Sequence, residues 1–204
     1  MKLGSWFLGI GAALFAVACG GSSDGGGSSV DATGFVGIYQ ATSYTENAAS
    51  CDAPGASILS PTKDPYFVIT TAEYLNQKVA TLISCSSVAD CQDKRARQAA
   101  DQGYSSDYMY TLSSTTNATT LAGFSAGSGS SEGANTCTGR TYSDHTLSVA
   151  ADHGVHLESR TKKLADKPME DGYCVVRPAE SEQEAAKVPC ASLEVLDGTF
   201  VQAM

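Results

Sequence analysis

Hydrophobic and polar residues alternate with a period of about two along most of the chain after residue 30. Runs rich in Val, Ile, Thr, Tyr and Phe, separated by Gly, Asn, Asp, Pro or Ser, are typical of short β-strands. The predicted strands are 35–45, 66–71, 78–84, 108–112, 119–124, 136–150, 155–162, 173–177 and 193–196 with 199–201. Strands at this meander-like spacing predict a mainly β domain, either an antiparallel meander barrel or a sandwich.

One stretch, 87–102, departs from this alternation and predicts a surface helix. Ser87 and Asp90 stand at the spacing of a capping box, and Gly103 is a natural residue to follow a helix end. The helix holds few large apolar residues, so its basic residues are interpreted as a solvated face. They are Lys94, Arg95 and Arg97. The acidic stretch 180–187 is a second, shorter helical candidate, and the Gly/Ser-rich stretch 126–133 is expected to be a loop.

The first hydrophobic run has a different character from the strands. Residues 3–18 carry no charge, follow Lys2 directly and end in Ala16-Val17-Ala18. Sixteen residues are short for a membrane span and suit the apolar core of a secretory signal peptide. We therefore predict a signal peptide over 1–18, with cleavage before Cys19.

The junction at Cys19 resembles the lipobox of bacterial lipoproteins, although Ala16 stands where that motif usually has Leu. The resemblance implies lipidation of Cys19; the same small residues also suit an ordinary signal peptidase and plain secretion. Gly and Ser dominate the next ten residues, which is typical of a flexible tether. The predicted organisation is a signal peptide at 1–18, a lipidated Cys19 and tether at 19–33, and a single β-rich domain at 34–204.

Cysteine usage agrees with export. The chain has seven cysteines, and removing Cys19 as a lipid carrier leaves an even set of six. Their spacings include no C-x-x-C pair, so disulfides are favoured over metal ligation or redox chemistry. Among the fifteen pairings that six cysteines allow, we favour three. They are Cys85–Cys91, Cys174–Cys190 and Cys51–Cys137.

The net charge of the chain restricts the classes of partner that we expect. Without Lys2, 22 acidic residues face 12 basic ones, and a net charge of about −10 argues against nucleic acid and direct adhesion to anionic lipid. The expected contact with a membrane, the outer membrane on its periplasmic or surface side, is therefore the lipid anchor. A small hydrophobic ligand or another envelope protein is the remaining class of partner.

Two weaker resemblances concern the folded part. The opening Gly37-Ile38-Tyr39 is similar to the Gly-x-Trp that begins the first strand of lipocalins, with Tyr in place of Trp, which implies a barrel rather than a sandwich. The composition and tether also resemble those of many myxobacterial lipoproteins, a resemblance that implies no activity.

One motif suggests an enzyme. Gly123-Phe124-Ser125-Ala126-Gly127 matches G-x-S-x-G, and His145 and His153 follow in the order that an α/β-hydrolase would use. That motif requires a helix after the serine, whereas Ser128-Gly129-Ser130-Ser131 cannot nucleate one. A serine hydrolase using Ser125 is therefore the alternative, and a non-enzymatic binding or structural protein is the prediction.

The three histidines, His145, His153 and His156, lie close together in the sequence and raise the question of a metal site. Residues of a strand and of its turn need not share a face, so we expect no metal. No P-loop, dinucleotide fingerprint, EF-hand loop or H-E-x-x-H is present, and no cofactor is expected.

Overall fold

The computed structural model describes residues 32–55, 64–74, 77–99, 109–112, 114–117, 119–130, 135–150 and 152–204. The predicted signal peptide, Cys19 and most of the tether lie outside these residues.

Antiparallel strands make up most of the described chain. The strands are β1 (Gly37–Asn47), β2 (Tyr66–Tyr74), β3 (Gln77–Cys85), β4 (Met109–Leu112), β5 (Ser114–Asn117), β6 (Thr120–Gly129), β7 (Thr136–Val149), β8 (Val155–Lys163), β9 (Lys167–Pro168) and β10 (Ser192–Gln202). The helices are α1 (Val88–Ala99) and α2 (Pro178–Ala185). The prediction of a mainly β, antiparallel, disulfide-stapled domain is confirmed.

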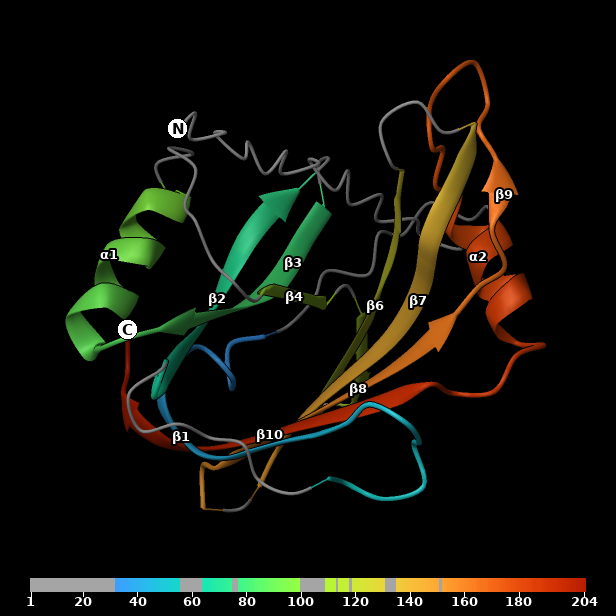
Figure 1. Ribbon diagram of the computed structural model, residues 1–204. Coiled ribbons are helices and arrows are strands. Elements are labelled where there is room, and N and C mark those ends of the chain that lie inside the picture. Colours follow the sequence, from blue (N-terminus) through green and yellow to red (C-terminus); the bar gives the residue numbers. More distant parts are fainter. Residues whose placement is uncertain are drawn as a thin grey trace, which may run out of the picture.

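The strands form one ten-stranded sheet in the order β4-β3-β2-β1-β10-β8-β7-β6-β5, and β9 joins it by pairing with the start of β7. It consists of two meanders, β1 to β4 and β5 to β8, and β10 joins them by pairing with both β1 and β8. The sheet curls strongly, so that β4 contacts β6 (Figure 1). The result is a half-barrel with a concave and a convex face.

The concave face carries the main hydrophobic core. Alternate side chains of a strand point to one face, and those from seven strands meet in one buried cluster. It includes Phe35, Tyr39, Phe67, Ile69, Leu82, Leu121, Leu147, Leu157 and Leu196. Tyr39 stacks on Phe67 with ring centroids 5.3 Å apart, and its hydroxyl donates a hydrogen bond to the Phe35 carbonyl at 2.8 Å. Burial of these aromatic rings ties the segment before β1 to the sheet.

Helix α1 lies on the convex face and packs on β2 and β3 (Figure 1). The Ser87 hydroxyl accepts a hydrogen bond from the Asp90 N–H at 3.1 Å, and the Asp90 carboxylate accepts one from the Ser86 N–H at 2.8 Å. The predicted helix start is therefore confirmed. The described helix ends at Ala99, and the last predicted residues, 100–102, lie outside the described part of the chain.

Helix α2 covers the opposite end of the sheet, against β6 and β7 (Figure 1). Tyr142 stacks on Phe124 with centroids 5.6 Å apart, and both pack with Leu164 and Ala185 in a second cluster. The buried guanidinium of Arg140 donates to the Glu184 carboxylate at 2.8 Å, so the one largely buried cation beneath this helix is neutralised.

Two predicted elements are wrong. Residues 173–177 form no strand: Tyr173 makes only an isolated bridge with Glu170 after a tight turn at Asp171 and Gly172, both with positive φ. Conversely, Ala126 to Gly129 belong to β6 rather than to a loop. Their small side chains are tolerated because β7 provides bulky partners, such as Tyr142 opposite Ala126.

Three disulfides connect the six cysteines of the domain. They are Cys51–Cys190, Cys85–Cys91 and Cys137–Cys174. The predicted Cys85–Cys91 bridge is confirmed, whereas the predicted pairings Cys174–Cys190 and Cys51–Cys137 are wrong. The physical reason is the strand pairing: Cys51 follows β1 and Cys190 precedes β10, and these two strands are neighbours.

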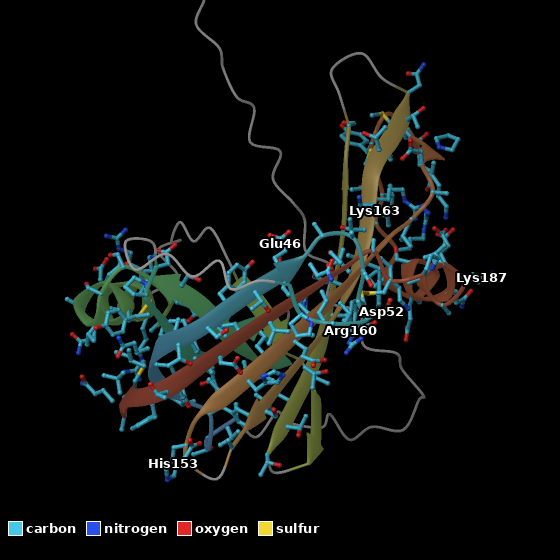
Figure 2. All side chains as sticks on the ribbon, turned by 60° about the horizontal axis from the view of Figure 1, so that its bottom comes forward. Glu46, Asp52, His153, Arg160, Lys163 and Lys187 are labelled. Atoms are coloured by element: carbon cyan, nitrogen blue, oxygen red, sulfur yellow. A yellow bond between two sulfur atoms is a disulfide. The ribbon has the colours of Figure 1, made fainter. Side chains whose placement is uncertain are left out.

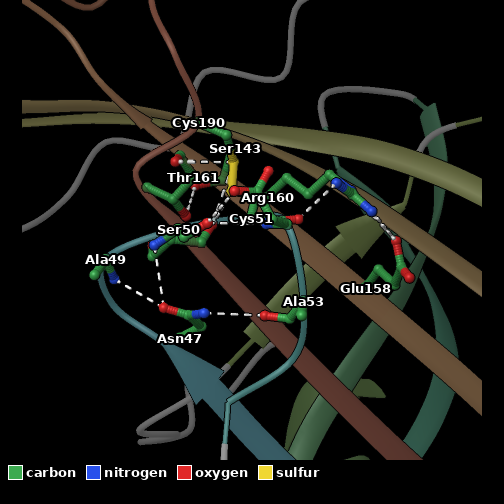
Figure 3. The surroundings of a disulfide bond; sticks show 12 residues. Asn47, Ala49, Ser50, Cys51, Ala53, Ser143, Glu158, Arg160, Thr161 and Cys190 are labelled. Carbon is green, nitrogen blue, oxygen red and sulfur yellow. Dashed lines mark hydrogen bonds and ion pairs between the residues drawn. A yellow bond between two sulfur atoms is a disulfide. The ribbon is translucent and has the colours of Figure 1, made fainter.

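The Cys51–Cys190 bridge sits in a compact loop (Figure 3). The Asn47 side-chain oxygen accepts hydrogen bonds from the Ala49 and Ser50 N–H groups, each at 3.1 Å. The Asn47 amide nitrogen donates to the Ala53 carbonyl at 3.0 Å. Asn47 therefore fixes the turn that carries Cys51 toward β10.

The long-range Cys51–Cys190 disulfide and the short-range Cys85–Cys91 disulfide should differ in their contribution to stability. In the chain-entropy account, a bridge across 139 residues stabilises the fold by about 5 kcal/mol and one across six by about 2 kcal/mol. We expect the Cys51→Ala/Cys190→Ala double variant to lower the free energy of unfolding more than Cys85→Ala/Cys91→Ala, as measured by urea titration. Equal losses, or a larger loss for the short bridge, would contradict this expectation.

Candidate functional site

Three rows of side chains cross the concave face side by side. The leucine row comprises Tyr44, Leu196, Leu157, Leu147 and Leu121, each opposite the next. The first polar row comprises Glu46, Glu194, Ser159 and His145. The second polar row comprises Ser192, Thr161, Ser143 and Ser125. Neighbouring rows are two residues apart along each strand, so the concave face changes from apolar to polar over two residues.

This arrangement follows from the two-residue period of the strands. On β7, every second residue from 147 back to 143 points to the concave face, namely Leu147, His145 and Ser143. On β8, the matching series runs forward from Leu157. Antiparallel pairing places these series in register, so one sequence pattern repeated on neighbouring strands produces continuous rows.

A hydrogen-bond network joins the two polar rows through His145. The imidazole Nε2 lies 3.0 Å from the Ser125 hydroxyl, and Nδ1 lies 3.0 Å from the Ser159 hydroxyl. In the second polar row, the hydroxyls of Ser143 and Thr161 are 2.7 Å apart. Since a neutral imidazole has one donor and one acceptor nitrogen, two hydroxyls satisfy it fully.

His145 is held neutral. Its side chain is 5% exposed, and burial lowers its pKa to about 4. At pH 7 the imidazole therefore serves as an uncharged hydrogen-bonding group.

The other end of the first polar row is acidic. Burial raises the pKa of Glu194 and the charge of Glu46 raises it further, while a hydrogen bond from Tyr44 opposes the shift. Glu46 is exposed and lies at the end of β1 (Figure 2). This end of the row thus combines two facing carboxylates with one phenol.

The other two histidines lie elsewhere. His153 is in the β7–β8 turn with φ of 62°, at the far end of the strands from Glu46 (Figure 2). His156 faces the convex side, where its Nδ1 lies 2.7 Å from Asp197. Burial alone would lower the pKa of His156, but Asp197 and Glu158 raise it. Within the described residues, no group of three or more His, Cys, Asp or Glu side chains is placed to hold a metal.

The G-x-S-x-G stretch lies inside β6, not at a strand-to-helix turn. The structure nevertheless brings Ser125 to His145, one of its two suggested partners, and leaves His153 in a separate turn. Sequence reasoning missed Ser143, Ser159, Thr161 and Glu194. The sequence pattern that could have identified them is the alternation of Leu with polar residues in the segments that form β7, β8 and β10.

No helix in the described part of the chain is long and apolar enough to cross a membrane. No protein-family model, curated protein or solved structure matches the chain.

Burial of neutral His145 predicts a pH dependence of stability. Its folded-state pKa of about 4 lies below the ordinary value of 6.5, so its stabilising contribution is complete above pH 6.5 and is lost as the pH falls toward 4. The shift corresponds to about 3 kcal/mol. We expect His145→Gln to flatten the fall in unfolding free energy between pH 6.5 and 4, measured by urea titration at each pH.

The exposed turn residue His153 provides the control. His153→Gln leaves the contacts of His145 intact and should retain the contribution of His145 to the slope. If His145→Gln also keeps that slope, His145 does not titrate with a depressed pKa.

Proposed function

We propose that the chain is an exported, lipid-anchored protein of the bacterial cell envelope that uses its half-barrel for binding. The observation that carries this proposal is the pairing of all six cysteines between residues 34 and 204. Cys19 is the seventh cysteine and has no remaining cysteine partner in the chain. Disulfides are favoured in an oxidising compartment, and a lipid on Cys19 accounts for the odd cysteine.

The anchor and the domain have separate roles in this proposal. The small residues before Cys19 direct cleavage and lipidation, and the Gly/Ser-rich segment after it separates the domain from the membrane. The membrane in this proposal is the outer membrane, on its periplasmic or surface side. The negative net charge offers no electrostatic attraction to anionic lipid, so the lipid alone holds the protein there.

In this proposal the three rows of side chains on the concave face form the binding surface. Hydroxyls, a neutral imidazole and carboxylates are fixed on hydrogen-bonded strands, and the half-buried ring of Tyr44, at the end of the leucine row, adds apolar surface beside them. Such a combination suits a small ligand with one apolar side, or a segment of another envelope protein. Tyr44, Glu46 and Glu194 are not fully buried, and neither are Ser192, Thr161 and Ser125 of the second polar row, so these residues make the first contacts.

The anchor is tested by Cys19→Ser. The wild-type protein should fractionate with membranes and incorporate labelled palmitate, and Cys19→Ser should do neither, because a single sulfur carries the acyl groups. Cys51→Ser is the matched control, since it removes a domain cysteine and should leave palmitate incorporation intact. A soluble, unlabelled wild-type protein would refute the lipoprotein assignment.

A serine hydrolase remains the second candidate because the Ser125 hydroxyl lies 3.0 Å from His145 Nε2. Three features weigh against it. The partner of Nδ1 is the Ser159 hydroxyl rather than a carboxylate, the low pKa of His145 makes it a poor proton acceptor, and Ser125 lies within a strand. We therefore favour binding.

A serine-directed fluorophosphonate probe distinguishes these functions. We expect no covalent labelling of the folded wild-type protein, as judged by intact mass. Labelling that disappears in both Ser125→Ala and His145→Gln, but persists in Ser143→Ala, would instead identify a nucleophile activated by His145.

A further inference from the structure

The leucines of the leucine row are buried, so a ligand can reach this apolar part of the concave face only if another segment moves away. All described members of their buried cluster lie on strands except Ala32 and Phe35, which are each 1% exposed. These two residues precede β1, and their segment lies on the concave side of the curled sheet (Figure 1). Residues 32–35 are therefore the candidate for the segment that moves, and we call them the strap.

The strap is held by contacts that can break without disturbing the sheet. The Phe35 N–H donates a hydrogen bond to the Ala32 carbonyl at 2.9 Å and closes a turn, and the Phe35 carbonyl accepts one from the Tyr39 hydroxyl at 2.8 Å. The ladders that hold β1 to its neighbours begin at Gly37 and Ile38, after the strap. Segments outside the strand ladders open locally at a lower free energy than core strands do, so the strap can open while the half-barrel stays folded.

The contacts of Phe35 define what could replace it. Phe35 supplies an aromatic ring to the cluster and a carbonyl oxygen to Tyr39. Tyr39 keeps its place without the strap, because it lies on β1 and stacks on Phe67 with ring centroids 5.3 Å apart. Opening of the strap exposes apolar surface and removes the acceptor of the Tyr39 hydroxyl, and both changes are unfavourable. A group with an aromatic ring beside a carbonyl oxygen restores both contacts.

We propose that the strap is autoinhibitory and that a partner binds the concave face by displacing Phe35, with an aromatic side chain in the buried cluster and a carbonyl oxygen on the Tyr39 hydroxyl. The partner class is a peptide segment of another protein with an exposed aromatic residue, because a ring beside a peptide carbonyl is what the strap itself supplies. This inference rests on the proposed binding function of the concave face. It adds that the apolar part of that face stays closed until the strap opens.

The test uses N-acetylphenylalanine amide as the probe and the full-length Cys19→Ser chain, which cannot be lipidated. A saturating concentration of the probe should accelerate amide hydrogen exchange at residues 33–36 at least tenfold, without accelerating exchange in β7 and β8. Chymotrypsin should then cleave after Phe35 faster than in the ligand-free chain. N-acetylalanine amide, which has the same carbonyls and no ring, should change neither rate.

Two variants and a control locate the site. Phe35→Ala should bind the probe at least tenfold more tightly than the parent chain in a calorimetric titration, because its own ring no longer competes. Adding Tyr39→Phe, which keeps the ring and removes the hydroxyl donor, should weaken that binding severalfold. Phe200→Ala should bind within twofold of the parent chain, because the Phe200 ring contacts Tyr39 at 5.6 Å between centroids but is 43% exposed and lies outside the buried cluster.

Unchanged or slower exchange at residues 33–36 with the probe bound would overturn the proposal, since the probe would then bind without displacing the strap. Equal affinities of Phe35→Ala and the parent chain, or no binding by either, would overturn it as well. If Phe35→Ala does not fold, the exchange and cleavage measurements on the parent chain decide alone. Exchange at 33–36 that is independent of urea in the ligand-free chain, while no added ligand perturbs the concave strands, would place the error in the proposed binding function rather than in the opening of the strap.

Discussion

The pairing of β1 with β10 is the interaction on which the rest of the structure depends. Nearly every other strand pair joins neighbours along the chain, whereas this pair joins residues 38–47 to residues 193–202. It converts two local meanders into one sheet, and the concave core forms only when both contribute. Closing so long a loop has a large entropic cost. The Cys51–Cys190 bridge lies at the end of this pair and reduces that cost once formed.

The same pairing determines what the concave face can do. Because side chains alternate, a slip of one residue would move Leu196 and Glu194 to the convex side and bring Val195 into the core. The correct register places Glu46 opposite Glu194 and continues across β8 and β7 to His145. The buried neutral imidazole and its two hydroxyl partners are therefore a product of sheet register as much as of residue identity.

Local patterns in the sequence predict local structure well here. Alternation locates β7 and β8, the pair of Ser87 and Asp90 locates the start of α1, and the shortest cysteine spacing identifies Cys85–Cys91. The errors concern contacts between distant segments. Both wrong disulfide pairings followed from not knowing that β1 lies beside β10.

Motif reasoning failed for a related reason. G-x-S-x-G drew attention to Ser125, which the sequence placed between a strand ending at 124 and a loop starting at 126, whereas pairing with β7 holds it inside a strand. Its contact with His145 depends on which residues of β6 and β7 face each other. The β-branched residues Val175 and Val176 resemble a strand in composition, yet no ladder includes them, and the turn before them directs the chain into α2.

The pairing of Ile38 with Gln202 places the start of β1 and the end of β10 at one edge of the domain. The segment that leads from the proposed anchor at Cys19 enters the domain at this edge, and Glu46 lies about 30 Å farther along β1. In this proposal the tether therefore joins the domain at one end of β1, and the acidic part of the concave face lies toward the other end, where a partner approaching from the aqueous side would meet Glu46 and Tyr44.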